Sequence, residues 1–147
     1  MQDLPHRYTA AARALAEGEV TLESPRLPSL SSAAPPEFGG PGDRWSPETL
    51  LVAAVADCFT LGFRAIAKAS KLEWVSLRCE VEGTLERVER ATRFTGFHVR
   101  ATLQVPAGTD QARARSLLEK AEKTCFISNS LKGASHLETT IEVAGNA

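Results

Sequence analysis

Two of the three cysteines lie where a thiol could do redox chemistry. Cys58 falls in an apolar stretch with helical spacing, and Cys125 falls at the end of a second such stretch. Both occupy the face that a helix buries, so both side chains can point into one core. A free cysteine often acts only as a small hydrophobe, so spacing alone leaves a functional and a structural role open. Cys79, at an apolar position of an expected strand, fits the structural role.

The number and spacing of the cysteines do not fit a disulfide-stapled secreted scaffold. The three cysteines are few and scattered, and none of them sits in a CxxC pair. In a reducing compartment, any disulfide that they formed would be redox-active rather than structural. The N-terminus lacks the apolar core of a secretory signal, and no apolar run reaches the roughly 18 residues that span a bilayer. We therefore expect a cytoplasmic protein.

The composition is that of a globular chain. With 147 residues, of which 43% are hydrophobic, a single domain over residues 1–147 can bury a real core. A formal net charge of −1 gives no long-range attraction for a polyanion. We expect neither nucleic acid nor a membrane as a partner.

A long helix is the element that must position Cys58. Ser46, Pro47 and Glu48 form a helix start, with Ser46 as the N-cap, proline at the first helical position and an acid in the first turn. Helical spacing of apolar residues continues to about Ser70. A helix of about 24 residues is roughly 36 Å long, so it should be the central helix of the core.

The remaining patterns indicate an α+β fold with antiparallel sheet. Alternation of apolar and polar residues predicts strands, and helical spacing predicts a second helix that carries Cys125 on its inward face. The expected elements besides the long helix are a hairpin of 8–10 and 20–22, an edge strand near 27–32, strands over 77–85 and 97–105 joined by a turn at 89–93, a helix over 114–125 and a strand over 137–143.

Two motifs around the cysteines resemble a known family. Residues 46–59, SPETLLVAAVADCF, resemble the signature N/S-P-E-x-L-x-x-A-x-x-x-C-F at the start of the long helix in OsmC and Ohr proteins. Residues 123–133, KTCFISNSLKG, resemble their second cysteine motif, C-P-V-S-x-x-L-K. The order of elements agrees with that family across nearly the whole chain.

The resemblance implies a peroxidase built as an intertwined homodimer, with antiparallel sheets wrapped around the central helices. In such proteins the thiolate at the position of Cys58 attacks the O–O bond of an organic hydroperoxide and becomes a sulfenic acid. The cysteine at the position of Cys125 then condenses with it, and an external dithiol, such as a lipoyl protein or a small thiol, reduces the disulfide. No bound cofactor is implied.

The family also uses an arginine to hold its cysteine as a thiolate and a glutamate, at the position of Glu48, to hold that arginine. Glu48 and Cys58 are ten residues apart on one helix, or about 15 Å, so Glu48 would have to act on a cysteine of another subunit. No arginine stands where the family places it. Arg44, just before the helix, is the favoured candidate, with Arg26 and Arg13 as the others; a solvated loop charge is the alternative role for Arg44.

Two further departures concern the cysteines directly. Asp57 replaces the usual small residue before Cys58, and Phe126 replaces the usual proline after Cys125. The missing arginine points to an alternative function, an OsmC-fold binding or structural protein that keeps both cysteines but has no peroxidase activity. A third interpretation, a metal site of Cys58, Cys125 and His136, lacks the paired spacing of zinc ligands.

The histidines do not indicate a nucleophilic hydrolase. None of them stands where a Cys-His pair can be argued from the sequence. Aromatic side chains could instead line an apolar pocket that favours a bulky organic peroxide, with ordinary core packing as the alternative for each. These side chains are Trp45, Phe59, Phe63 and Phe126.

Overall fold

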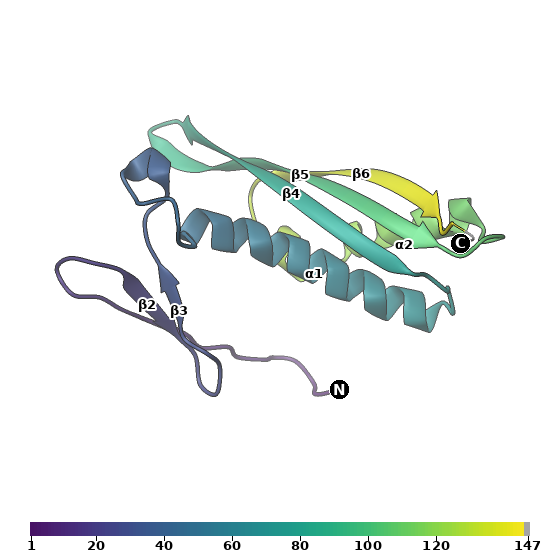
Figure 1. Cartoon of the computed structure of the whole chain (residues 1–147), viewed down its shortest axis with the longest axis horizontal. Helices are drawn as coiled ribbons and strands as arrows, with labels where there is room; N and C mark the ends of the chain where they lie inside the picture. The colour runs from purple at the N-terminus through teal and green to yellow at the C-terminus, as the bar shows by residue number, and fades with distance from the viewer. Residues whose placement is uncertain (146–147) are drawn as a thin grey trace. The chain divides into compact units, whose positions relative to one another are not determined.

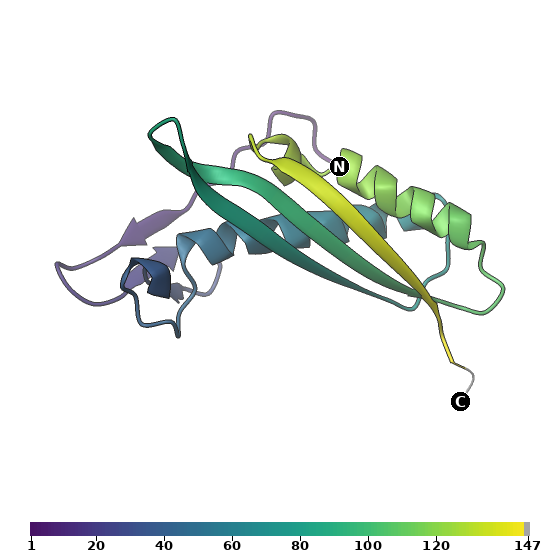
Figure 2. The same cartoon turned by 90° about the horizontal axis from the view of Figure 1, so that it is seen from above.

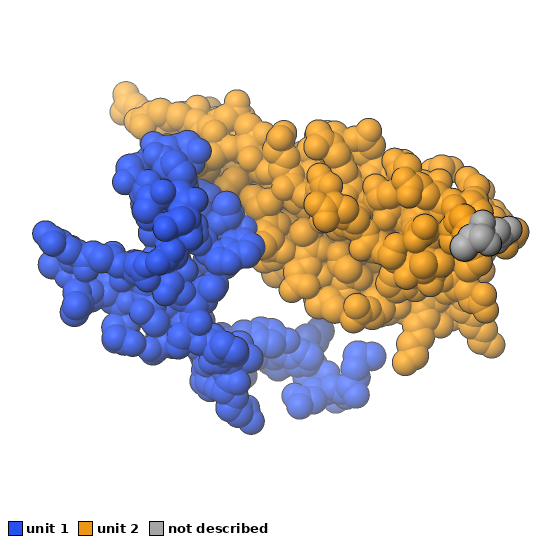
Figure 3. All heavy atoms as spheres, viewed as in Figure 1, with its two compact units in different colours: residues 1–50 blue, residues 51–147 orange. Residues whose placement is uncertain are grey.

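The computed structural model describes residues 1–145 and divides into two compact units, Met1–Leu50 and Leu51–Ala147, coloured separately in Figure 3. The first unit holds three short strands, and the second holds most of the long helix with a second sheet. Each unit is described by itself.

The first unit is built on a three-stranded antiparallel sheet in the order β1-β2-β3. The strands are β1 (Ala11–Arg13), β2 (Val20–Glu23) and β3 (Leu30–Ser32), followed by the 3-10 turn η1 (Pro36–Phe38). The N-terminal hairpin is present, but its first strand lies at 11–13 rather than 8–10, because Ala11 pairs with Glu23 and Arg13 with Thr21. The edge strand expected near 27–32 is β3.

Helix α1 (Pro47–Ala69) starts where the capping residues predict. The backbone N–H of Thr49 donates to Ser46 Oγ at 3.1 Å, and the N–H of Ser46 donates to Thr49 Oγ1 at 2.8 Å. This reciprocal pair satisfies backbone donors that the first turn of a helix otherwise leaves free. Ser46 is buried, so the cap is shielded from water.

The second unit contains a three-stranded sheet in the order β4-β5-β6. Strands β4 (Ser76–Val88) and β5 (Ala91–Val105) form an antiparallel hairpin, and its two-residue turn places Glu89 and Arg90 at positive φ, as the twist of a tight hairpin favours. Figure 1 shows the hairpin running along α1.

The last strand, β6 (Ala134–Val143), pairs parallel with β5 rather than antiparallel. The connection explains this direction. In the sequence, helices α2 (Gln111–Lys123) and α3 (Phe126–Asn129) follow β5 and precede β6, and they carry the chain back to the end of the sheet where β5 began. The α+β class is confirmed, with a mixed sheet in this unit. Figure 2 shows β6 beside β5.

The core lies between one face of this sheet and the helices α1 and α2. Inward residues of β5 alternate with outward ones, and α2 contributes Ala114, Leu118 and Ala121. The buried residues of α1 follow at intervals of four, as one face of a helix requires: Val55, Phe59, Phe63 and Ala67.

Helix α1 is long, and its apolar residues extend beyond the face that it buries. By length and composition it could cross a bilayer, although the sequence has no uninterrupted apolar run. Its buried face, however, packs in the core of a sheet whose other face carries charged side chains such as Arg78, Glu80 and Glu138. This packing marks α1 as the core helix of the unit.

Candidate active site

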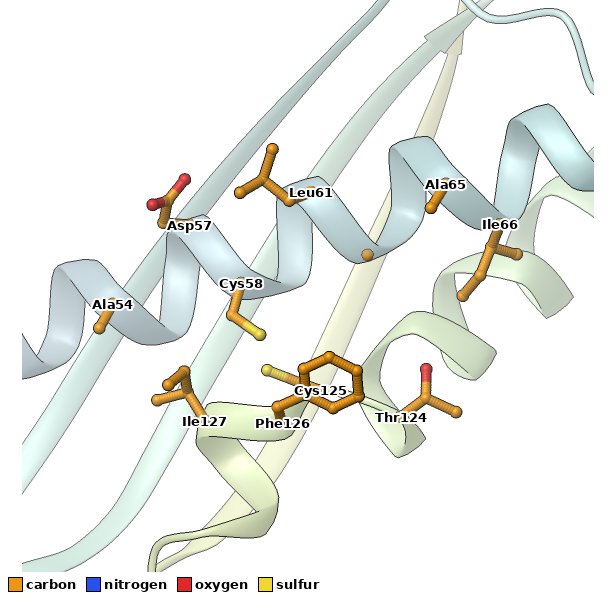
Figure 4. Close-up of a pocket in the computed structure, with 11 residues that line it drawn as sticks. Ala54, Asp57, Cys58, Leu61, Ala65, Ile66, Thr124, Cys125, Phe126 and Ile127 are labelled. Atoms are coloured by element: carbon orange, nitrogen blue, oxygen red, sulfur yellow. The ribbon is translucent and has the colours of Figure 1, made fainter. Parts of the chain in front are cut away.

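Cys58 and Cys125 line the same pocket of the second unit, which has a volume of about 590 Å³. Cys58 is half-buried in the middle of α1, and Cys125 is buried; both are free thiols. Figure 4 shows their sulfur atoms pointing toward each other across the space between α1 and the start of α3. The structure thus brings together two thiols that are far apart in the sequence.

Cys125 is positioned by a change of direction between two helices. Helix α2 ends at Lys123, two residues earlier than expected, and Cys125 has extended backbone angles at the N-cap of α3. The N–H of Asn129 donates to the Cys125 carbonyl at 3.0 Å, which closes the first turn of α3. Cys125 is therefore not the last residue of a helix but the first residue before the next one.

The surroundings of Cys58 act on its thiol in opposite directions. Burial raises the pKa of Cys58, and the neighbouring Cys125 thiol raises it further, whereas the backbone N–H groups of Ile127 and Phe126 lower it. The net pKa is above the ordinary value. Within the described part of the chain, the groups that favour the thiolate of Cys58 are these two N–H groups, and none of the groups that shift its pKa is a cation.

The two backbone donors were not predicted from the sequence. Phe126 and Ile127 stand out in the motif only as a replaced proline and its neighbour, and this replacement signals an additional N–H group at Phe126 alone. Proline has no N–H, so phenylalanine after Cys125 adds a donor near Cys58.

Cys79 has the properties of a core residue. It lies on β4, is half-buried and packs against the hydrophobic core. Burial raises the pKa of Cys79 to about 11, although a hydrogen bond with Thr60 acts against this. Such a thiol is almost entirely protonated near neutral pH and reacts slowly.

The three candidate arginines all belong to the first unit. Arg44 donates to Glu19 at 2.6 Å and forms an ion pair with Asp43 at 3.2 Å. The hydrogen bond from Arg44 lowers the pKa of the Glu19 carboxyl. Arg13 pairs with Glu23 at 2.8 Å, and Arg26 is exposed in a turn with φ of 65°. Arg44 thus binds two acids, and neither of them is Glu48.

Glu48 has a free acceptor in an otherwise apolar setting. Its Oε1 atom is buried and has no hydrogen-bond partner among the described residues. The side chain lines a pocket of about 370 Å³ in the first unit, together with apolar residues such as Val20, Leu22 and Phe38. A buried carboxylate oxygen without a donor is costly, so this atom is suited to receive a cationic or N–H group.

The aromatic residues divide between pocket and core. Phe126 lines the pocket of the two cysteines and is 80% exposed, whereas Phe59 and Phe63 are fully buried. Trp45 lines a different pocket, in the first unit. For Phe59 and Phe63 the alternative of ordinary core packing is therefore the correct one, and Trp45 does not line the cysteine pocket.

The third interpretation, a metal site of Cys58, Cys125 and His136, is not supported by the positions of these residues. His136 is exposed on β6, at a position that alternates with the inward residues Leu137 and Ile141. Among residues 1–145, no three His, Cys, Asp or Glu side chains lie close enough together to hold a metal ion.

Comparison with known proteins agrees with this architecture. The model of the family described as OsmC-like protein matches residues 40–140. The uncharacterized protein YmaD of Bacillus subtilis is 29% identical over 130 residues, covering 85% of this chain and 86% of the relative. An organic hydroperoxide resistance protein of Xanthomonas axonopodis pv. citri is 31% identical over 140 residues, covering 93% and 94%.

The fold is also that of a solved structure. A crystal structure of an organic hydroperoxide resistance protein OsmC from Legionella pneumophila superposes with a TM-score of 0.74 and 27% identity, covering 96% of this chain and all of that one. The family model, the relative from Xanthomonas and this solved structure all match the chain to OsmC-like or organic hydroperoxide resistance proteins. The chain belongs to the OsmC-like protein family.

Proposed function

We propose that the protein is a thiol-dependent peroxidase that reduces organic hydroperoxides. The observation that carries the proposal is the placement of Cys58 and Cys125 with facing sulfur atoms in one apolar pocket. Relatives named organic hydroperoxide resistance protein support the substrate class.

The reaction runs in three balanced steps. The Cys58 thiolate attacks the terminal oxygen of ROOH and the O–O bond breaks. Cys58 becomes a sulfenic acid, and the alkoxide RO⁻ leaves as ROH after it takes a proton from water, which replaces the proton that Cys58 lost on ionisation. The Cys125 thiol attacks that sulfur, so that an S–S bond forms and water leaves. An external dithiol, such as a lipoyl protein or a small thiol, then reduces the disulfide and is itself oxidised.

The thiolate needs more support than one chain supplies, since burial raises the pKa of Cys58. We infer that a cation acts on Cys58 when two copies form a homodimer, with Arg44 as the candidate and Glu48 as the acid that holds it. The free Oε1 of Glu48 supports this role. Arg44 would then exchange Glu19 for Glu48. We further expect the protein to work in the cytoplasm, where a dithiol reductant is present.

A second candidate function is an OsmC-fold binding protein without peroxidase activity. The raised pKa of Cys58 favours it, because a protonated thiol does not attack peroxides efficiently.

Single-turnover kinetics with cumene hydroperoxide separate the two functions. The reduced protein should lose its Cys58 thiol rapidly, Cys58→Ser should abolish the reaction, and Cys125→Ser should leave a sulfenic acid that dimedone traps. Cys79→Ser is the matched control and should react as the wild type does. If the wild-type thiols survive a modest excess of peroxide, the protein is not a peroxidase and the binding function stands.

A further inference from the structure

The side of α1 that the chain leaves uncovered carries charges of both signs around one apolar residue. Asp57, Leu61, Arg64 and Lys68 are all exposed. At about 100° per residue, these four positions fall within about 60° of one another around the helix axis. Figure 4 shows the side chains of Asp57 and Leu61 on the same side of α1, away from the two sulfur atoms. The four residues therefore form one stripe along the helix.

Neither Asp57 nor Arg64 has an ion-pair partner in its own chain. The ion pairs among the described residues involve neither side chain. The positions three and four residues before and after each of them on α1 hold no charge of the opposite sign. Asp57 and Arg64 are themselves seven residues apart, or about 10 Å along the axis, so they do not face each other within the helix.

A second copy of the chain brings these two residues together. Two copies in a homodimer are related by a two-fold axis. With this axis near Leu61 and the two α1 helices antiparallel, Asp57 lies about 6 Å from the axis along the helix. Arg64 of the partner subunit lies about 4.5 Å from the axis on the same side, so the two residues are nearly level. Packed helices lie about 8 to 10 Å apart, which the two side chains can span together.

The charges favour this antiparallel arrangement over a parallel one. In a parallel pair of helices each residue of the stripe faces its own copy, so that Asp57 would meet the partner's Asp57. Like charges set against each other at an interface are costly. The antiparallel arrangement instead makes the contact between Asp57 and the partner's Arg64 twice, once on each side of the axis.

We propose that Asp57 forms an ion pair with Arg64 of the partner subunit across an antiparallel contact of two α1 helices, and that the two reciprocal pairs fix the register of the homodimer. This inference rests on the homodimer of the proposed function and names the residues that orient it. Asp57 also lines the cysteine pocket. The partner's Arg64 therefore joins the wall of that pocket and offsets the negative charge of the residue next to Cys58.

Lys68 is the other cation of the stripe, and it fits the contact less well. A pair of Asp57 with the partner's Lys68 would move the two-fold axis to a point between Gly62 and Phe63. Phe63 is fully buried in the core, and the exposed Leu61 would no longer lie at the centre of the contact. The planar guanidinium of an arginine also matches a carboxylate with two hydrogen bonds, which an ammonium group does not.

Charge reversal distinguishes a contact between subunits from a role within one chain. Asp57→Arg alone and Arg64→Asp alone each set like charges against each other, so each should raise the dissociation constant of the homodimer by about tenfold or more. When the two variants are produced together in equal amounts, a heterodimer of one with the other has opposite charges at both contacts. Native mass spectrometry should therefore find the heterodimer well above the roughly one half that random pairing gives.

Glu119→Arg produced together with Lys120→Glu is the control, because both residues are exposed on α2 and lie outside the stripe. This pair should combine at random. Random pairing of Asp57→Arg with Arg64→Asp overturns the proposed contact, and so does preferential pairing of Asp57→Arg with Lys68→Asp. A monomeric wild type overturns the homodimer and the contact with it. The composition of the dimers is measured without peroxide, so a failure of the peroxidase reaction is detected separately.

Discussion

At the scale of single residues, Cys58 experiences two opposing influences. Its position among apolar side chains favours the neutral thiol, and the N–H groups of Phe126 and Ile127 favour the thiolate. Burial has the larger effect, so the pKa is raised. A low-pKa thiolate at this position requires a positive charge from outside the immediate surroundings of Cys58, because a nearby cation favours the charged form of the thiol.

The role of Arg44 can be tested through the pH dependence of Cys58. If Arg44 supplies the positive charge, Arg44→Gln raises the pKa of Cys58. The thiolate fraction at neutral pH then falls, and alkylation of Cys58 by iodoacetamide at pH 7 becomes about tenfold slower when the pKa rises by about one. Mass spectrometry of the Cys58 peptide measures the rate of alkylation at each pH between 5 and 10, and the midpoint of this pH profile gives the pKa of Cys58.

Arg13→Gln provides the comparison for this measurement, because Arg13 also pairs with a glutamate in the first unit. Its midpoint should match that of the wild type. Equal midpoints for Arg44→Gln and the wild type would show that Arg44 does not act on Cys58, and a higher midpoint only in Arg13→Gln would assign the role to Arg13.

At the scale of elements, helix α1 has an apolar side that the single chain does not bury. Val55, Phe59, Phe63 and Ala67 are buried against the sheet, but Leu61, on another side of the helix, is 52% exposed. A helix that is apolar nearly all round is normally buried nearly all round. A second copy of the chain packed against this side would bury it. This exposed apolar side therefore supports the proposed homodimer.

A charge at Leu61 should therefore disrupt the dimer. We expect the wild type to sediment at twice the mass of the 15.8 kDa chain, and Leu61→Glu to sediment as the monomer because a carboxylate would be buried without a partner. Analytical ultracentrifugation gives the mass, and circular dichroism shows that the variant is folded. Leu15→Glu, at a position 87% exposed between β1 and β2, should stay dimeric. A monomeric wild type at micromolar concentration, or a dimeric Leu61→Glu, contradicts the proposal.

At the scale of the whole molecule, features that depend on neighbouring residues could be predicted from the sequence. The direction and register of strand pairing could not. The start of α1 follows from Ser46 because capping depends on neighbouring residues only. The direction of β6 depends on how α2 and α3 return the chain to β5, so alternation within the strand could not give it. The first strand of the N-terminal hairpin was misplaced for a similar reason, since its register is set by pairing with β2.

The candidate site shows the same division. The two cysteine motifs predicted that Cys58 and Cys125 belong together, and the structure places both in one pocket. Which aromatic side chains join them depends on the packing of the core, and helical periodicity could not separate Phe59 and Phe63, which face the sheet, from Phe126, which faces the pocket. The N–H groups near Cys58 arise from the turn between α2 and α3, which no residue pattern specified.

The most direct test of the proposed chemistry is the bond that one turnover leaves behind. After reaction of the reduced protein with one equivalent of cumene hydroperoxide, peptide mapping by mass spectrometry should find a Cys58–Cys125 disulfide and Cys79 as a free thiol. Recovery of Cys58 as a thiol, or of a disulfide that joins Cys79 instead, would contradict the proposed reaction of Cys58 and Cys125.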